Sequence, residues 1–422
     1  MEFSSLYEKV IKCSKCGFCQ PTCPTYNATG LEQEVARGRN QIVRGIIEGD
    51  LEFTRDVKAA LFNCLLCDAC YTNCFPKIKT DQIITQARYE YIKRFGQPQL
   101  QKYIFKTLLR SPESMTRLVK LVSFGKKTGL SGLVQVLRIL GWFGRNLANA
   151  ESLMASIPGT FLREKIADRS FRPEKRRAKL AYFVGCGINY AHPDVGLATL
   201  EVFYSRGFEI EILPNVCCGL PAYAYGDIES AKWFAEQNLR LMANSDADYI
   251  MTDCASCTSF LKEYEWLFAD QPERAEEVKK IVARTKDATT ILWESEEFAR
   301  YTADTTRKVT FHEPCHLAHY LGEKTAPQAV LNNLPNAEFV ELPESDYCCG
   351  GAGSYNIAHY ELSMKILDRK MKNVESTGAD ILVTACPACM IQLDYGVRRQ
   401  GLPTKVKHIT QLLQKQSEKT RE

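Results

Sequence analysis

Residues 13–24 read CSKCGFCQPTCP, and residues 64–76 read CLLCDACYTNCFP. Both stretches have the spacing Cys-x2-Cys-x2-Cys-x3-Cys. Proline follows the last cysteine directly in the first stretch, and after one phenylalanine in the second. Two such runs are typical of bacterial domains that hold two [4Fe-4S] cubanes. Residues 1–97 are therefore predicted to form an α-helical, ferredoxin-like domain with two clusters.

The order of the eight cysteines also predicts which thiols share a cluster. In this pattern the fourth cysteine of each run ligates the cluster of the other run. One predicted set is Cys13, Cys16, Cys19 and Cys74. The other predicted set is Cys64, Cys67, Cys70 and Cys23. A zinc ribbon would offer two pairs of cysteines per ion, so this spacing favours iron–sulfur clusters over zinc.

Ten further cysteines form two sets in residues 179–415, and each set has a single cysteine, an adjacent pair and a Cys-x2-Cys pair. The first thiol set is Cys186, Cys217, Cys218, Cys254 and Cys257. The second thiol set is Cys315, Cys348, Cys349, Cys386 and Cys389. Corresponding cysteines lie 129 to 132 residues apart. So constant an offset indicates an internal duplication, with domains over residues 179–300 and 301–415.

Short apolar runs precede these cysteines, and amphipathic runs follow several of them. The apolar runs are rich in β-branched and aromatic residues, which predicts strands. The predicted strands are 180–184, 209–213, 249–252, 309–311, 339–342 and 381–384, and two predicted helices are 227–243 and 359–376. Alternating strands and helices indicate parallel α/β sheets. The thiols of each set should then meet at the carboxyl edge of one sheet, where such sheets bind ligands.

Five thiols at one site are one more than a cubane or a zinc ion uses. Adjacent cysteines can bridge or ligate neighbouring irons, and the glycine after each pair (Gly219, Gly350) lets the backbone approach a bulky group. The run Gly350–Gly353 could donate backbone N–H groups to cluster sulfurs. Two alternatives stay open at this stage: buried structural cysteines, or zinc on the two Cys-x2-Cys pairs.

The sequence His312-Glu313-Pro314-Cys315-His316 satisfies the H-E-x-x-H pattern of zinc proteases. That pattern works only within a helix, where both histidines share one face. Pro314 cannot occupy a helix interior, so a metalloprotease is excluded. His316 and His319 are either ordinary packing residues or hydrogen-bond donors near the second thiol set.

Residues 98–178 contain no cysteine and are rich in Leu, Lys and Arg. This block is predicted to be a helical linker or docking segment. Its clearest amphipathic helix covers residues 130–147, with apolar side chains at helical spacing. The helix either packs between two domains or offers a surface to a partner subunit or a membrane.

Composition limits the remaining function classes. A net charge of +4 without a clustered basic face gives no support for nucleic-acid binding. The start of the chain lacks the pattern of a signal peptide, and no apolar stretch is long enough to span a bilayer, so a cytoplasmic location is expected. Neither G-x-G-x-x-G nor a Walker A run occurs, so no flavin or nicotinamide site is expected. Electrons must therefore be exchanged with a partner.

Several motifs resemble those of the glycolate oxidase iron–sulfur subunit family, which is related to subunits of lactate utilisation and anaerobic glycerol-3-phosphate dehydrogenase. They are Cys-Gly-Phe-Cys at 16–19, Cys-Pro-Thr-Tyr at 23–26, Arg37-Gly38-Arg39 and the two cysteine-rich repeats. The resemblance implies an α+β multidomain oxidoreductase subunit. It also implies a separate FAD-containing dehydrogenase subunit as the electron donor. The acceptor would be a quinone, an electron-transfer flavoprotein or another carrier, with peripheral association at the inner face of the cytoplasmic membrane as an option.

The repeats also resemble heterodisulfide reductase catalytic subunits. That resemblance implies a noncubane [4Fe-4S] cluster on each thiol set, in addition to the two cubanes. Three hypotheses follow: an electron-transfer subunit of a 2-hydroxy-acid dehydrogenase, a disulfide reductase, or a zinc-stabilised scaffold with a redox-active ferredoxin domain.

Overall fold

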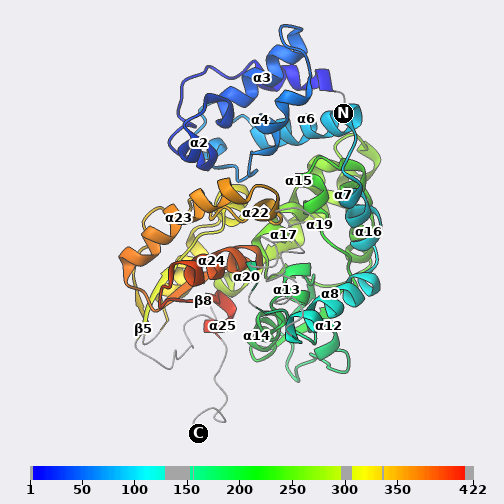
Figure 1. Cartoon of the computed structure of the whole chain (residues 1–422). Coiled ribbons are helices and arrows are strands. Elements are labelled where there is room, and N and C mark those ends of the chain that lie inside the picture. The colour runs from blue at the N-terminus through cyan, green and yellow to red at the C-terminus, as the bar shows by residue number, and fades with distance from the viewer. Residues whose placement is uncertain (1–2, 129–152, 155, 296–306, 335–336, 414–422) are drawn as a thin grey trace.

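The computed structural model describes residues 3–128, 153–154, 156–295, 307–334 and 337–413. Figure 1 shows an N-terminal helical module, coloured blue, that lies across the ends of two α/β units. The first α/β unit is green and the second is yellow to red. The predicted fold class, a ferredoxin-like module followed by two parallel α/β units, is confirmed.

The ferredoxin-like module is built from short helices joined by the cysteine-bearing loops. Its core contains the fully buried side chains of Leu6, Val43, Ile83 and Ile84. The elements are η1 (Phe3–Leu6), α1 (Tyr7–Val10), α2 (Pro24–Thr29), η2 (Glu32–Glu34), α3 (Ala36–Glu48), η3 (Arg55–Val57), α4 (Lys58–Phe62), α5 (Ala69–Thr72) and α6 (Thr80–Phe95). The two longest helices, α3 and α6, pack against each other and fix the loops between them.

The linker contains α7 (Gln99–Tyr103), η4 (Ile104–Leu108), α8 (Pro112–Lys127) and α12 (Leu162–Lys165). Ser111 caps α8 by accepting a hydrogen bond from the backbone N–H of Ser114, and Pro112 occupies the first turn, where proline is tolerated. The predicted helix over 130–147 lies outside the described residues. Among the helices that are described, none is long and apolar enough to cross a membrane.

The first α/β unit has a four-stranded parallel sheet in the order β2-β1-β3-β4. Its strands are β1 (Ala178–Tyr182), β2 (Phe208–Ile212), β3 (Tyr249–Thr252) and β4 (Thr285–Asp287). Its helices are α13 (Cys186–Tyr190), α14 (Pro193–Tyr204), α15 (Leu220–Ala224), α16 (Ile228–Ala243), α17 (Ala255–Lys262), α18 (Tyr264–Leu267), α19 (Pro272–Arg284) and α20 (Ala288–Glu294).

The second α/β unit repeats this topology with the order β6-β5-β7-β8. Its strands are β5 (Arg307–Phe311), β6 (Ala337–Phe339), β7 (Ile381–Thr384) and β8 (Lys405–His408). Its helices are η6 (His316–Tyr320), α21 (Thr325–Asn332), α22 (Tyr355–Ala358), α23 (Tyr360–Thr377), α24 (Pro387–Gln400) and α25 (Ile409–Leu412).

The ends of β1, β2 and β5 differ from the predicted strands by one or two residues, and two larger differences occur. The strand predicted over 339–342 is β6, which starts earlier and shares only Phe339 with the prediction, because Pro343 and the left-handed Glu344 (φ 52°) turn the chain away from the sheet. β4 and β8 were not predicted from the sequence, since both are short, polar edge strands without an apolar run.

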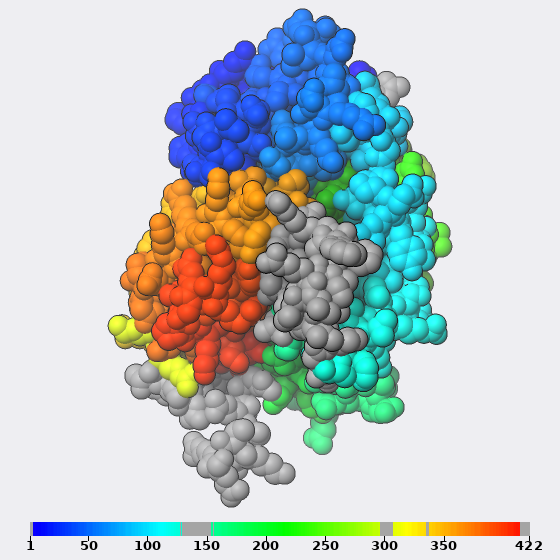
Figure 2. Space-filling model, in the orientation of Figure 1, coloured from blue at the N-terminus to red at the C-terminus, as the bar shows by residue number. Residues whose placement is uncertain are grey.

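Hydrogen bonds from both α/β units hold the ferredoxin-like module. Arg88 on α6 donates to the carbonyl of Ala224 in the first unit. In the second unit, the hydroxyl of Tyr355 donates to the carbonyl of Asn63 at 2.9 Å, and that of Tyr320 donates to the carbonyl of Leu66 at 3.0 Å. These partly buried contacts hold the cysteine loops of the module against both units, and Figure 2 shows the blue module directly on the orange surface of the second unit.

Candidate iron–sulfur centres

The cysteines Cys13, Cys16, Cys19 and Cys74, here called the outer set, line one small cavity at the surface of the ferredoxin-like module. Cys16 is exposed to solvent. Phe18 and Phe75 flank the set, and their exposed fractions are 64% and 92%. The chain therefore brings together the four thiols predicted to share a cluster, at a site that another protein could reach.

The motif Arg37-Gly38-Arg39 supports the loops of both ferredoxin sets. Arg37 donates to the carbonyl of Lys15 at 3.0 Å and pairs with Glu32 at 2.6 Å. A Cβ atom on Gly38 would lie 1.9 Å from the carbonyl oxygen of Glu32, so only glycine fits there. Arg39 is buried and pairs with Glu34 at 2.8 Å.

The cysteines Cys23, Cys64, Cys67 and Cys70, here called the inner set, line a second small cavity deeper in the module. The guanidinium of Arg39 also lines this cavity. The guanidinium of Arg88 donates to the carbonyl of Cys64 at 2.6 Å. Two buried cations therefore lie close to thiols that would be ionised as cluster ligands.

The first thiol set occupies the carboxyl edge of the sheet β2-β1-β3-β4. Chain order reverses between β1 and β3, and the thiols follow both of these strands, at the point where doubly wound sheets bind ligands. Cys186 is the first residue of α13, and Cys254 is the N-cap of α17. The hydrogen bond with Cys217 and burial raise the pKa of the Cys186 thiol. The hydrogen bond with Cys257 favours the thiolate of Cys254, but the hydrogen bond with Cys386 and burial raise its pKa. A bound metal would therefore supply the ionised form of both thiols.

The adjacent pairs of both sets lie in turns that require the following glycine. Gly219 has φ 98° and Gly350 has φ 83°, in the left-handed region that glycine tolerates. The N–H of each glycine points at a thiol, with Gly219 donating to Cys217 at 3.5 Å and Gly350 donating to Cys348 at 3.4 Å. The two turns therefore repeat the same geometry.

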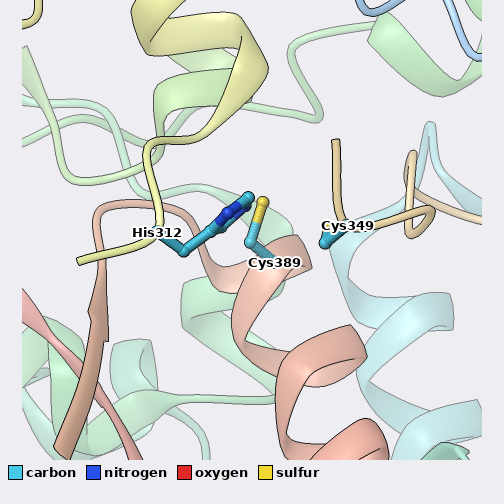
Figure 3. Close-up of side chains that lie close together, drawn as sticks. All are labelled: His312, Cys349 and Cys389. Carbon is cyan, nitrogen blue, oxygen red and sulfur yellow. The ribbon is translucent and has the colours of Figure 1, made fainter. Parts of the chain in front are cut away.

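The second thiol set follows the same plan at the edge of β6-β5-β7-β8. Cys315 is the N-cap of η6 and Cys386 is the N-cap of α24, with Pro387 in its first turn. Unlike the first set, the second set has a histidine close to two of its thiols. His312, Cys349 and Cys389 place their donor atoms within 4.8 Å of one another, and all three side chains are buried (Figure 3).

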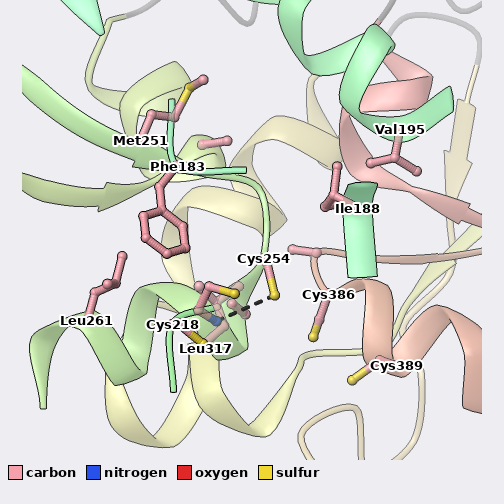
Figure 4. Packing of buried hydrophobic residues seen from close by; sticks show 14 of the residues in the cluster. Phe183, Ile188, Val195, Cys218, Met251, Cys254, Leu261, Leu317, Cys386 and Cys389 are labelled. Carbon is pink, nitrogen blue, oxygen red and sulfur yellow. Dashed lines mark hydrogen bonds between the residues drawn. The ribbon is translucent and has the colours of Figure 1, made fainter. Parts of the chain in front are cut away.

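The ten thiols of the two sets form a continuous series across the boundary between the units. Within each set, neighbouring thiols lie within hydrogen-bonding reach of one another. Between the sets, Cys254 contacts Cys386, and Figure 4 shows these two side chains near each other. The backbone N–H of Ala255 also donates to the carbonyl of Ala385 at 3.1 Å, which fixes the two sheet edges together.

A second junction joins the second thiol set to the inner set. Cys67, Cys315 and Cys348 belong to one buried cluster of side chains. The imidazole of His319 forms a hydrogen bond with the carbonyl of Cys67 at 2.9 Å. The order in space is therefore outer set, inner set, second thiol set and first thiol set.

Three histidines near Cys315, namely His312, His316 and His319, have different neighbours. The segment that contains them is not one continuous helix. His312 follows β5, and Pro314 precedes η6. The ring of His316 lies 3.7 Å from the thiol of Cys315 and stacks on Tyr320. Burial opposes a charge on His319, but its hydrogen bond to Asp346 and the nearby Cys315 raise its pKa.

Charged groups around the two thiol sets differ. In the first unit, burial raises the pKa of Asp253 to about 6 and that of Asp287 to about 7. In the second unit, burial lowers the pKa of Lys370 to about 8, while the thiols of Cys348 and Cys349 favour its charged form. Two buried acids therefore lie in the first unit, and a buried lysine lies beside the second set, where Glu313 is buried as well.

A larger cavity of about 250 Å³ lies between the ferredoxin-like module and the two α/β units. Four thiols of the first set line it: Cys186, Cys218, Cys254 and Cys257. The remaining lining is mainly apolar and aromatic, and its polar members include Ser256, Ser259, Glu263, His316, Tyr320 and Ser354. No thiol of the second set is among the described residues that line this cavity. A small molecule could therefore approach the first set alone.

The donor chemistry of all four sites fits iron–sulfur clusters. Every predicted ligand is a sulfur, the thiols gather at cavities or sheet edges, and backbone N–H groups and buried cations accompany them, as such clusters require. The individual ligand assignments remain predictions. Sequence reasoning missed His312, although aligning the two repeats on their strands would have placed it opposite Phe183.

Comparisons with known proteins match all parts of this arrangement. A 4Fe-4S dicluster domain model matches residues 9–78, and a cysteine-rich domain model matches residues 180–262 and 309–394. The linker region of the glycolate oxidase iron–sulfur subunit matches residues 96–154. The chain is therefore an iron–sulfur protein in which both repeats belong to one domain type.

Individual relatives resemble either nearly the whole chain or a little more than half of it. A probable glycolate oxidase iron–sulfur subunit of Bacillus subtilis is 32% identical over 96% of this chain and 93% of its own length. Lactate utilization protein A of Geobacillus thermodenitrificans is 35% identical over 56% of this chain and 98% of its own length. The same protein of Bacillus cytotoxicus is 33% identical over 57% of this chain and all of its own length.

Proposed function

The chain belongs to the family of glycolate oxidase iron–sulfur subunits, and we propose that it relays electrons within an FAD-dependent 2-hydroxy-acid dehydrogenase complex of the glycolate or lactate type. A partner subunit would oxidise the substrate on its flavin. This chain would take the electrons singly and pass them to a quinone, an electron-transfer flavoprotein or another carrier. We assign two cubane clusters to the outer and inner sets and two noncubane [4Fe-4S] clusters to the thiol sets.

The spatial series of the four cysteine sets carries this proposal. One end is the outer set at the surface, and the other end is the first thiol set beside the large cavity. The inner set and the second thiol set lie between them and share a buried cluster of side chains. A series with two accessible ends suits a relay between two redox partners, because electrons can enter at one end and leave at the other.

The features of each end suggest the direction of transfer. The outer set is flanked by exposed Phe18 and Phe75, and by exposed Lys12, Lys15 and Lys77. Apolar side chains within a basic rim suit docking of a protein with an acidic surface, so we assign the flavin subunit to this end. The apolar cavity beside the first thiol set suits a small acceptor such as a quinone.

Anaerobic co-purification with an FAD subunit tests the proposal. Addition of glycolate or lactate to the complex should reduce the iron–sulfur signals in electron paramagnetic resonance, and iron analysis should give about 16 irons per chain. A chain that binds flavin itself, or that exists in cells as a stable lone monomer, would contradict the proposal. About 8 irons with zinc would instead support the zinc-stabilised scaffold.

A pair of surface variants tests the docking end. Phe18→Ser with Phe75→Ser should weaken binding of the flavin subunit about tenfold or more while leaving iron content unchanged. Phe124→Ser is the matched control, because Phe124 is 65% exposed on α8. Loss of binding in the Phe124 variant alone would place the partner on the linker and refute the assigned end.

The cavity supports a second candidate, a heterodisulfide reductase-like activity at the first thiol set. A disulfide entering this cavity would meet thiols of the first set, and its reduction to two thiols requires two electrons and two protons. Thiols added to the oxidised protein should then produce a new paramagnetic signal. Absence of that signal with all candidate disulfides and thiols would exclude this candidate and leave the relay proposal intact.

A further inference from the structure

His312 is a fully buried histidine without a conventional partner. Its exposed fraction is 0%, and neither ring nitrogen has a nitrogen or oxygen partner in the described part of the chain, whereas the thiol of Cys349 lies within hydrogen-bonding reach of the ring. A buried polar atom left unsatisfied destabilises the folded state. Such an atom in a folded protein calls for an explanation, and a bound ion is one of the few available.

The imidazole faces two thiols of the second set. One nitrogen of His312 and the sulfurs of Cys349 and Cys389 all lie within 4.8 Å of one another (Figure 3). These three residues come from separate segments: the end of β5, the turn after Cys348, and the first turn of α24. Imidazole nitrogen and thiolate sulfur are both ligands for iron, and a mixed set of this kind occurs in iron–sulfur proteins.

The first α/β unit shows that the fold does not require histidine at this position. His312 directly follows β5, and Phe183 directly follows β1. The two backbones are held identically, because the N–H of His312 donates to Val383 and that of Phe183 donates to Met251, both at 2.9 Å. Phe183 is fully buried in the hydrocarbon core near Cys218 (Figure 4). An apolar ring therefore satisfies the packing, and the histidine must serve something else.

The other histidines nearby already have partners. His316 lies beside Cys315 and Ser256 and stacks on Tyr320. His319 contacts the carbonyl of Cys67 and the carboxylate of Asp346. Among these three histidines, only His312 has a ring nitrogen close to two thiols and no nitrogen or oxygen partner in the described part of the chain.

We propose that His312 is a sixth ligand of the second centre and bonds to iron through an imidazole nitrogen. The second centre would then have nitrogen and sulfur ligands, whereas the first centre would have sulfur ligands only. The proposal rests on the proposed function in one respect, since it requires iron on the second thiol set. An additional nitrogen ligand changes the electron density at iron, so the two centres would have different potentials although their cysteine patterns match.

Pulsed electron paramagnetic resonance of the anaerobic full-length chain tests this ligand directly. Protein with 14N-histidine and protein with 15N-histidine should show one strongly coupled nitrogen whose frequency changes with the isotope. His312→Phe, which installs the residue of the first unit, should abolish that coupling. His312→Cys should abolish it too while keeping a metal ligand and the wild-type iron content.

His359→Phe is the matched control, because His359 is half-buried and stacks on Tyr355 away from the three donors. It should keep the nitrogen coupling and the iron content. Wild-type protein with full iron but no strongly coupled nitrogen, or equal coupling in His312→Phe, would overturn the proposal. Wild-type protein that lacks iron on the second thiol set would instead show that the cluster assignment itself is wrong.

Discussion

The two α/β units share strand order, cysteine spacing and turn geometry, but differ in the groups that surround the thiols. Phe183 of the first unit corresponds to His312 of the second, and Asp287 at the end of β4 corresponds to His408 at the end of β8. Phe234 packs on Gly219 as Ile366 packs on Gly350. Asn238 and Lys370, each four residues further along the same helices, therefore correspond as well.

The direction of these differences is consistent. The first unit has apolar, amide or acidic side chains where the second has histidine or lysine. The first unit also borders the large cavity, whereas the second borders the inner set of the ferredoxin-like module. The two units therefore share the strand order, the cysteine spacing and the glycine turns, whereas different side chains around the thiols give the two predicted centres different electrostatic surroundings.

Removal of one cysteine from each adjacent pair should have the largest effect. Cys349→Ala and Cys218→Ala should each lower the iron content by about 4 irons per chain, because each disrupts one [4Fe-4S] centre. Only Cys349→Ala should also stop substrate-driven reduction of the other α/β unit, since the second set lies between the inner set and the first set. Iron analysis and electron paramagnetic resonance of the complex measure both effects.

If substrate reduces the first set in the Cys349→Ala complex as fully as in the wild-type complex, the proposed order of the four sites would be contradicted. It would mean that electrons reach the first set directly from the ferredoxin-like module. The comparison of the two variants therefore tests the spatial series and not just the number of clusters.

The two glycine turns should differ in their tolerance of a side chain. A Cβ on Gly350 would lie 2.8 Å from the carbonyl of Ser363, whereas the closest atom to a Cβ on Gly219 is Phe234 Cβ at 3.1 Å. Gly350→Ala should therefore lower the free energy of unfolding by about 3 kcal/mol and Gly219→Ala by about 2 kcal/mol. Anaerobic urea unfolding measures both.

Gly353→Ala separates backbone strain from crowding in this experiment. Gly353 has φ 66°, but a Cβ there would meet no atom within 4 Å. Its substitution should cost only about 1 kcal/mol. If Gly353→Ala lowers the free energy of unfolding as much as Gly350→Ala does, the left-handed backbone, and not contact with Ser363, would account for the cost of Gly350→Ala.

Asp287 and His408 should give the two units opposite pH dependence. Burial raises the pKa of Asp287 to about 7, so the folded state holds more protons than the unfolded state and stability falls as pH rises from about 4 to 7. Burial lowers the pKa of His408 to about 4, so stability falls as pH drops from about 6.5 to 4.

Thermal unfolding of Asp287→Asn between pH 5 and 8 checks the acidic side of this comparison. The asparagine keeps the N-cap hydrogen bond to Thr289, which Asp287 accepts at 2.8 Å. The free energy of unfolding of the variant should exceed that of the wild type by about 1–2 kcal/mol at pH 8 and differ little from it at pH 5. His408→Asn should instead be more stable than the wild type at pH 5. Parallel profiles of the two variants would refute the contrast.

The smallest effect is expected from Lys370→Asn, which installs the residue of the first unit. Lys370 is fully buried beside the adjacent cysteine pair and donates to the carbonyl of Ser345 at 3.2 Å. Loss of its charge should shift the potential of the second centre negative by tens of millivolts without loss of iron. Lys372→Asn, on the exposed face of the same helix, should shift it much less in a redox titration.

Much of this architecture follows from the sequence because the cysteines and apolar runs are local signals. The predicted helix over 227–243 is α16, with Asp227 as its N-cap, and the predicted strand over 249–252 is β3. The duplication is visible from the cysteine offsets alone. Such features need only spacing and periodicity, which a single chain displays without reference to distant residues.

Contacts between distant segments could not be predicted in the same way. The position of Cys254 against Cys386 depends on how two sheets meet, and no local pattern encodes that. β4 and β8 are too polar to resemble strands until they are paired with β3 and β7. His312 entered the sequence analysis only through a protease-like pattern that Pro314 excludes, although its neighbours in space are thiols.

The close fit between α6 and the first α/β unit has a consequence for kinetics. A Cβ on Gly226 would lie 2.6 Å from the backbone of Arg88, and Arg88 itself bonds to the carbonyls of Leu61 and Cys64 in one module and Ala224 in the other. If the chain relays electrons as proposed, modules held this tightly would need no domain movement for electrons to pass between them. Added glycerol or sucrose should therefore slow the encounter with an external carrier, while transfer inside the chain stays insensitive to solvent viscosity.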